Sequence, residues 1–195
     1  MRRLLCLLAC GACGWSASDL AVYRLLPPQT HSFELSYDAS VTRVGAEYFF
    51  NPVRPGSVVT KESAIDLATG KPLELKTVKG REAKASGGVP PDTSDDSEFL
   101  WVKLLRGVPK GAETRIRIVR TYSDPASYQT TSTGFIFDRP LAVTRNIIVL
   151  PQGYELIGSR SPGIVTTDAD GRVRISFFND RDDMLPVRIV GRKLP

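Results

Sequence analysis

The sequence predicts an all-β fold, an antiparallel β-sandwich of about ten to twelve short strands. Apolar and polar residues alternate with a period of two, and the alternating stretches are rich in β-branched and aromatic side chains. Turn signals recur about every 8–12 residues, which is the spacing of a sandwich. Long helical periodicity is absent. Most of the 14 prolines lie between the alternating stretches, where they end strands without removing donors from a hydrogen-bond ladder.

The first strands are predicted in the N-terminal third of the sequence. Phe33, Leu35 and Tyr37 alternate with polar residues, as expected for a strand with one buried face. Residues 63–78 predict a hairpin that turns at residues 68–72, where glycine and proline follow each other closely.

Two strands are predicted on either side of a proline–glycine turn in the middle of the chain. In residues 99–105, every second residue from Leu100 onward is apolar, and Trp101 lies on the opposite face. In residues 113–122, apolar residues alternate from Ile116 onward with arginines on the other face. Both stretches therefore indicate strands that cover a core on one side.

The C-terminal part of the sequence completes the predicted sandwich. Residues 147–150 are a continuous apolar run ended by a proline–glycine turn. Asp170 and Gly171 predict a tight hairpin within residues 163–178, because both residue types can adopt positive φ. Residues 187–189 supply the last strand.

Residues 80–98 interrupt this pattern with the composition of a flexible loop. A loop of this length is long for a compact domain, which favours a mobile functional loop or a linker. The strands that follow it do not indicate a separate core. We therefore expect residues 19–195 to form one sandwich domain that contains this loop, and the alternative is two smaller sandwiches divided near residue 125.

The cysteines of the chain mark its N-terminal segment. Cys6, Cys10 and Cys13 all lie within an apolar stretch that follows two arginines at positions 2–3. A basic start, a short apolar run and small residues predict a signal peptide over residues 1–18, and thus export from a bacterial cytoplasm. The apolar run is about half as long as a membrane-spanning helix requires.

Residues 7–10, Leu-Leu-Ala-Cys, resemble the lipobox of bacterial lipoproteins. The resemblance implies that Cys10 is acylated and anchors the mature chain to a membrane, with the domain in the periplasm or at the outer membrane. Residues 14–30 would then form a tether between the membrane and the domain. The alternative is ordinary cleavage after Gly14 or near residues 17–18, which would release a soluble domain without a thiol.

Composition and charge exclude several classes of protein. The chain is 42% hydrophobic and 24% charged, which is typical of a globular domain. Its formal net charge of +5 includes two arginines of the predicted leader. This charge is too small and too dispersed for a nucleic-acid partner.

Motifs for the common catalytic chemistries are absent from the sequence. His31 is the only histidine, and no Gly-x-Ser-x-Gly elbow supplies a serine nucleophile, so we expect a structural or exposed histidine. One histidine, with no cysteine after Cys13, cannot assemble a zinc site. Phosphate- and dinucleotide-binding glycine motifs are also missing. The sequence thus predicts no catalytic residue, no metal site and no cofactor.

Carboxylates keep one enzymatic alternative open, because two of them can hydrolyse glycosides without a histidine. Acidic residues gather at positions 92–98, but a flexible loop holds such a pair poorly, and a solvated loop is the favoured interpretation. Residues 168–171 resemble part of a calcium loop, although Phe177 occupies the position of its bidentate glutamate. A hairpin turn accounts for this motif without a metal ion.

The sequence also suggests surfaces for recognition. The candidate binding surface is an aromatic segment around one arginine, for which ordinary packing is the alternative: Tyr122, Tyr128, Phe135 and Arg139. Trp101 could stack on a sugar or belong to the core. Outward-facing arginines would form a basic ladder if their strands were neighbours, the alternative being solubility and protection of strand edges: Arg115, Arg117, Arg172, Arg174 and Arg188.

Residues 63–122 resemble the N-terminal β-sandwich of zinc aminopeptidases. The stretches Ala-Thr-Gly-Lys-Pro-Leu-Glu-Leu, Phe-Leu-Trp-Val-Lys-Leu and Val-Pro-Lys-Gly-Ala-Glu-Thr-Arg-Ile-Arg-Ile repeat that domain's order of a hairpin and then a glycine turn into a strand. The resemblance covers about a third of the chain and implies a β domain of similar build. The His-Glu-x-x-His helix that carries activity in that family is missing, so no catalytic residue is implied.

These observations predict an exported protein of the bacterial cell envelope that acts without catalysis. Its β-sandwich is expected to bind a protein or an envelope polymer. The alternatives are a hydrolase that acts on an envelope polymer through Asp and Glu, and an accessory domain of a peptidase encoded elsewhere.

Overall fold

A computed structural model describes residues 16–195 of the chain. Cys10 and most of the predicted leader lie outside these residues. Within them, regular structure consists of fourteen strands, one α-helix and one 3-10 turn, which confirms the all-β prediction. No helix in this part of the chain is long and apolar enough to cross a membrane.

The elements follow one another along the chain with short connections. They are β1 (Leu20–Leu25), the 3-10 turn η1 (Pro28–Thr30), β2 (Ser32–Val41), β3 (Tyr48–Pro52), β4 (Val58–Asp66), β5 (Leu75–Lys79), α1 (Gly80–Ala85), β6 (Glu98–Lys103), β7 (Thr114–Ser123), β8 (Tyr128–Thr130), β9 (Gly134–Leu141), β10 (Arg145–Val149), β11 (Tyr154–Ser159), β12 (Ile164–Thr167), β13 (Val173–Phe178) and β14 (Leu185–Lys193).

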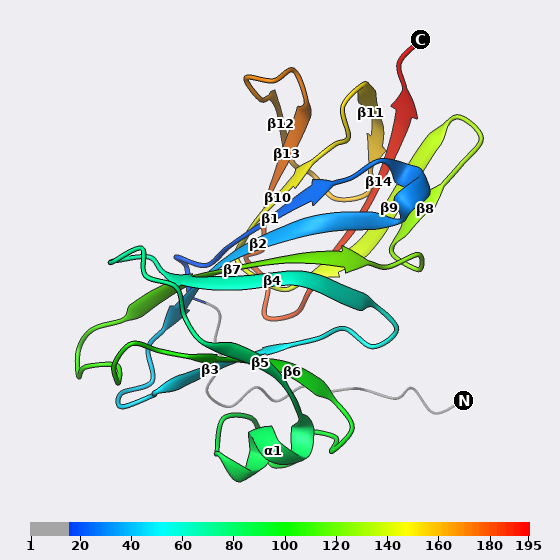
Figure 1. The fold of residues 1–195 in the computed structure, drawn as a ribbon. Helices are drawn as coiled ribbons and strands as arrows, with labels where there is room; N and C mark the ends of the chain where they lie inside the picture. The colour runs from blue at the N-terminus through cyan, green and yellow to red at the C-terminus, as the bar shows by residue number, and fades with distance from the viewer. Residues whose placement is uncertain (1–15) are drawn as a thin grey trace.

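The strands form three sheets (Figure 1). The largest has seven strands in the order β12-β13-β10-β1-β2-β7-β4, the second has the order β11-β14-β9-β8, and the third has the order β3-β6-β5. Among the described strands, β1 and β10 form the one parallel pair, and the other pairs are antiparallel as predicted. The first strand of the domain therefore lies between a neighbour in sequence and a strand from the C-terminal half.

Both smaller sheets pack on the same face of the seven-stranded sheet. Phe33 and Tyr37 point from one face of β2; Phe33 contacts Phe137 of β9, and Tyr37 contacts Phe49 of β3. One hydrophobic cluster includes residues from all three sheets. The seven-stranded sheet also takes strands from both sides of residue 125. The main hydrophobic cluster therefore takes residues from both sides of residue 125.

The alternation predicted for residues 99–105 and 113–122 is present in β6 and β7. Leu100 and Ile116 are buried, whereas Trp101 is partly exposed on the opposite face of β6. The period-two pattern identified these strands because each has one face on the core.

The hairpin predicted at residues 63–78 is present only at its turn. The carboxylate of Asp66 accepts hydrogen bonds from the amide and the hydroxyl of Thr69, both at 2.8 Å, and closes the turn. The returning chain forms an isolated bridge between Ile65 and Pro72 and then leaves for the three-stranded sheet as β5. Proline has no amide proton to extend the ladder with β4.

The hairpin predicted at Asp170 and Gly171 is confirmed as the connection between β12 and β13. Its turn differs from the predicted one, because only Gly171 has positive φ, at +82°. The amide of Gly171 donates to the carbonyl of Asp168 at 2.9 Å, and the amide of Asp168 donates to the carbonyl of Arg172 at 2.8 Å. A three-residue loop with glycine in the left-handed position therefore replaces the expected two-residue turn.

The segment predicted as a flexible loop, residues 80–98, begins with a helix instead. Residues 80–85 form α1, in which Ala83 is fully buried in a small cluster on the three-stranded sheet. A Cβ atom on Gly80 would lie 2.0 Å from the carbonyl oxygen of Ser94, so the two ends of the segment touch. Two alanines favour the helix, and burial of Ala83 stabilises it, which composition alone does not indicate.

The tether predicted at residues 14–30 is not present in the described part of that range. β1 lies in the middle of the seven-stranded sheet, and Pro28 begins the turn that connects β1 to β2. Alternating burial along β1 shows that this segment belongs to the core.

Candidate functional site

The four residues predicted as a binding surface are buried, so that prediction is wrong. Tyr122 is 2% exposed, Tyr128 and Phe135 are 0% exposed, and Arg139 is 9% exposed. Tyr128 and Phe135 pack edge to face with centroids 5.5 Å apart. These side chains occupy inward positions of β7, β8 and β9. These aromatic residues are close in sequence because β7, β8 and β9 follow one another along the chain and all three contribute side chains to the same core.

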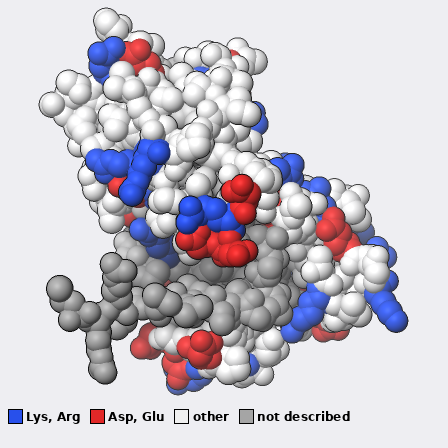
Figure 2. Space-filling model, turned by 180° about the vertical axis from the view of Figure 1, so that it is seen from behind, with Lys and Arg blue, Asp and Glu red and all other residues white. Residues whose placement is uncertain are grey.

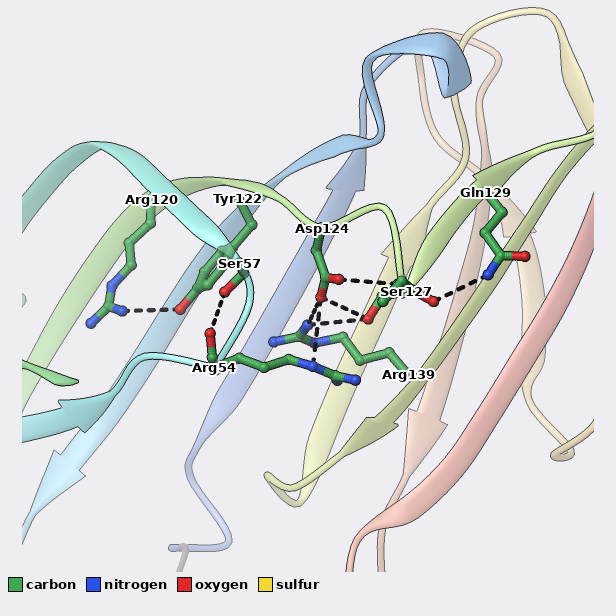
Figure 3. A network of polar contacts seen from close by, with 9 residues as sticks. Arg54, Ser57, Arg120, Tyr122, Asp124, Ser127, Gln129 and Arg139 are labelled. Atoms are coloured by element: carbon green, nitrogen blue, oxygen red, sulfur yellow. Dashed lines mark hydrogen bonds and ion pairs between the residues drawn. The ribbon is translucent and has the colours of Figure 1, made fainter. Parts of the chain in front are cut away.

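Arg139 belongs to a buried network of polar contacts (Figure 3). Its Nη1 atom donates to Oδ2 of Asp124 at 2.8 Å, and the hydroxyl of Ser127 donates to the same oxygen at 2.7 Å. Nε of Arg54 lies 3.6 Å from that oxygen. The guanidinium carbon of Arg139 is 5.3 Å from the ring centroid of Phe33. The network joins the β3–β4 connection, the β7–β8 turn and β9, and we assign it a structural role.

A second buried arginine, Arg120, lies in β7 and is 1% exposed. It donates to the hydroxyl of Tyr122 at 3.0 Å, and its Nε atom lies 3.6 Å from a carboxylate oxygen of Glu62. Glu62 follows Lys61, whose φ of +53° lies in a bulge where the pairing of β4 with β7 shifts register. The bulge brings a carboxylate close to a buried cation, which offsets part of the cost of burying it.

His31 has a structural contact. Its Nδ1 atom lies 2.9 Å from the carbonyl oxygen of Tyr128, which joins the end of η1 to β8. Among residues 16–195, no group of three or more His, Cys, Asp or Glu side chains is arranged to hold a metal ion.

Four of the carboxylates considered for catalysis or calcium binding are paired with cations. The ammonium of Lys84 lowers the pKa of Asp95, and the guanidinium of Arg172 lowers the pKa of Asp170. A general acid at neutral pH requires the opposite shift. The ion pairs in these two segments are Asp95–Lys84, Glu98–Lys79, Asp168–Arg174 and Asp170–Arg172.

The outward-facing arginines do not form a basic ladder. Three strands separate β7 from β13, and β14 belongs to another sheet. Figure 2 shows basic and acidic side chains side by side in mixed groups on the face in view. Four of the arginines have their own carboxylate, in the pairs Arg117–Asp38, Arg172–Asp170, Arg174–Asp168 and Arg188–Asp138.

An aromatic surface lies on the outer face of the three-stranded sheet, which is turned away from the seven-stranded sheet. The register places Phe50, Trp101 and Lys76 side by side on β3, β6 and β5. The rings of Tyr48 and Trp101 are stacked with centroids 4.9 Å apart and an interplanar angle of 29°. Nζ of Lys76 lies 4.9 Å from the ring centroid of Trp101, at cation–π distance.

α1 covers only one half of this outer face (Figure 1). Ala83 packs into the cluster formed by Phe50, Val78 and Phe99. Tyr48 and Trp101 lie at the edge of that cluster and are partly exposed. The outer face of the sheet therefore presents the stacked rings of Tyr48 and Trp101 beside α1.

Two hollows share Tyr48 and Ser86 in their linings, and we call the two together the aromatic groove. One, of about 260 Å³, is lined by Tyr48, Phe50, Lys76, Val78, Glu82, Ser86 and Trp101. The other, of about 290 Å³, is lined by residues 43–48 and Ser86. The groove combines three aromatic rings with an ammonium, carboxylates, a guanidinium and a hydroxyl, which suits a ligand that has both apolar faces and hydrogen-bonding edges.

The sequence indicated Trp101 as a possible sugar-stacking residue but did not indicate its neighbours in the groove. The run Tyr48-Phe49-Phe50 alternates around a strand and is the one local signal that could have indicated them. Pairing of β3 with β6, and the position of α1, depend on long-range packing that no local pattern contains.

The comparisons with known proteins support the fold. No known protein family matches the sequence, and no curated protein matches it either. Among solved structures, the chain is similar to the M1 zinc metallopeptidase from Deinococcus radiodurans, with 10% identity and a TM-score of 0.53 over 89% of this chain and 41% of that one. A variant of a two-domain M1 zinc metallopeptidase bound to L-arginine gives 11% identity and a TM-score of 0.54, with the same coverages.

A third similar structure is an aminopeptidase N family protein from Idiomarina loihiensis, with 10% identity and a TM-score of 0.50 over 89% of this chain and 29% of that one. The chain thus spans about two fifths or less of these proteins. At such identities the likeness shows the fold alone, and it confirms the architectural resemblance to zinc aminopeptidases that residues 63–122 suggested.

Proposed function

We propose that this protein is an exported, non-catalytic binding module of the bacterial cell envelope, and that the aromatic groove is its binding site. The observation that carries the proposal is the half-covered outer face of the three-stranded sheet. A core would be completed by burying Tyr48 and Trp101, yet both stay partly exposed at the edge of the small cluster, beside Glu82 of α1. Partly exposed stacked aromatic rings beside charged side chains are typical of a recognition surface rather than of a solvated sheet.

The chemistry of the groove favours a glycan polymer of the envelope as the ligand. Pyranose rings have apolar faces that pack on aromatic rings, and Trp101 and Tyr48 supply such rings. Sugar hydroxyls donate and accept hydrogen bonds, and Glu82 and Lys76 supply an acceptor and a donor at the same place. The side chain of Lys76 is exposed and can move aside, because it makes no ion pair among the described residues.

A sedimentation assay with isolated cell-wall sacculi tests this proposal. We expect the purified protein to sediment with sacculi and Trp101→Ala to bind about tenfold more weakly, which corresponds to about 1.4 kcal/mol. The matched control is Phe178→Ala, which removes an aromatic ring that is 64% exposed on β13, outside the groove. Circular dichroism would show that both variants are folded. Equal binding by the two variants, or no binding of the unaltered protein, would contradict the proposal.

The structural comparisons favour a second candidate function, that of an accessory domain of a peptidase. The similar structures are described as zinc metallopeptidases, one of them as having two domains, and the chain matches only a part of each. Crosslinking in intact cells, followed by identification of the captured proteins, tests this candidate. Capture of a protein with the His-Glu-x-x-His motif would support it, and capture of cell-wall material alone would favour the first proposal.

A further inference from the structure

The beginning of the described chain, Ser16 to Asp19, is built into the domain. These residues form a turn in which the amide of Asp19 donates to the carbonyl of Ser16 at 2.9 Å. Asp19 itself is 3% exposed. Its carboxylate accepts hydrogen bonds from the hydroxyl of Tyr37 at 3.0 Å and from the amide of Ser40 at 2.9 Å. The turn is thus fixed to the end of β2.

The backbone carbonyls of the same turn are also engaged. The carbonyl of Ser18 accepts hydrogen bonds from two guanidinium groups, those of Arg115 at the start of β7 and Arg145 at the start of β10. The carbonyl of Ser16 accepts one from the hydroxyl of Thr144 at 3.3 Å. Side chains from three separate parts of the chain therefore converge on residues 16–19.

We infer that the leader is removed upstream of Ser16, so that residues 16–19 belong to the mature protein. This inference rests on the proposed export. Cleavage between Ala17 and Ser18 would remove the carbonyl of Ser16 and create an α-ammonium on the residue that already faces Arg115 and Arg145. The turn would then hold three positive charges against the one carboxylate of Asp19, and like charges so close together disfavour the charged state.

Of the processing positions that the sequence offered, cleavage before Cys10 and cleavage after Gly14 both leave this turn intact. If Cys10 is the acylated first residue, six Cα–Cα steps separate it from the fixed Ser16. At about 3.5 Å per residue, this connection is at most about 20 Å long. The domain would then lie close to the membrane surface rather than at the end of a long tether.

The short connection also determines which end of the domain faces the membrane. The end that holds the turn contains Arg115, Arg145 and Ser40. The acylated protein would therefore hold this end of the domain toward the anionic headgroups, with the exposed Arg145 on that side.

Intact-mass analysis of the mature protein from its native host, combined with N-terminal peptide mapping, tests the inference. A diacylglyceryl-modified Cys10 supports the position of cleavage and the short connection together. An unmodified N-terminus at Trp15 supports cleavage upstream of Ser16 and overturns the lipid anchor predicted at Cys10. An N-terminus at Ser18 or further along overturns the inference itself. Cys10→Ser should abolish the lipid mass, whereas the control Cys13→Ser should leave it unchanged.

A second measurement on the same material is independent of the processing enzyme. Hydrogen exchange should be slow at the amides of Asp19 and Ser40, because both donate hydrogen bonds within this turn. Exchange at the rate of an unstructured peptide at both amides would show that the turn is not part of the folded mature domain, and would overturn the inference even if residues 16–19 were retained.

Discussion

Asp124 offers the sharpest test of how the three sheets are held together, because one carboxylate serves several partners. It accepts hydrogen bonds from Arg139 at 2.8 Å and from the hydroxyl and amide of Ser127 at 2.7 and 3.1 Å. Asp124→Ala would leave the guanidinium of Arg139, which is 9% exposed, without its counter-ion. Removal of one partner from a buried ion pair costs about 3–5 kcal/mol, which is a large part of the stability of about 5–15 kcal/mol typical of a domain.

Urea unfolding followed by circular dichroism measures this cost. We expect Asp124→Ala to lower the free energy of unfolding by about 3–5 kcal/mol. Combination with Arg139→Met should restore much of the loss, since the buried charge is then gone and the methionine can pack against Phe33. Asp182→Ala, which removes an exposed carboxylate without an ion pair among the described residues, should change the stability by less than about 0.5 kcal/mol.

A cost of less than about 1 kcal/mol for Asp124→Ala, or a double variant no more stable than the single one, would contradict this role of Asp124. Either result would mean that Arg139 is solvated in the folded state or that its contacts with aromatic rings suffice to hold it. Should Asp124→Ala fail to fold, Asp124→Asn retains the acceptor for Ser127 and should show a smaller loss of the same origin.

Two further predictions concern single positions. Burial raises the pKa of Asp19 above its ordinary value of 3.8 despite the hydrogen bond from Tyr37, so the folded state binds more protons than the unfolded state just above that value. The thermal midpoint of the unaltered protein should therefore rise relative to that of Asp19→Asn as the pH falls through this window, and a constant difference between the two across the window would contradict the assignment. Gly134→Ala should destabilise the protein by about 1–3 kcal/mol or more in chemical unfolding, because its Cβ would lie 2.0 Å from the carbonyl oxygen of Gly191. Gly158→Ala meets no atom within 4 Å and is the matched control, so equal losses in the two variants would exclude this steric explanation.

Most strands could be predicted from the sequence because each has one face on the core. Along β2, Phe33, Leu35 and Tyr37 alternate with more exposed residues, and the period-two pattern records that difference directly. The pairing partner of each strand could not be predicted in the same way. β4 and β5 follow a well-formed turn at Asp66, yet β5 pairs with β6 in another sheet, because sheet membership depends on packing between distant segments.

The candidate site could be predicted only in part for the same reason. Trp101 and Tyr122 both lie in alternating aromatic strands, but Trp101 is on the outer face of a three-stranded sheet, and Tyr122 is on the inner face of a seven-stranded one. Which face is covered depends on α1 and on the other sheets. In β7 the arginines on the other face mark the side of Tyr122 as the inner one, whereas neither face of β6 is strongly charged, so the local pattern there identifies two faces without indicating which is left exposed.

The parallel pairing of β1 with β10 also bears on how the molecule is made. Leu20 pairs with Arg145, so the central pairing of the largest sheet can form only after a segment much later in the sequence has been synthesised. Contacts between such distant segments slow folding, because the entropy of a long loop is lost before the contacts are gained. This delay would suit the export that we propose, since a chain that cannot finish its central sheet stays extended enough to pass through a translocation channel.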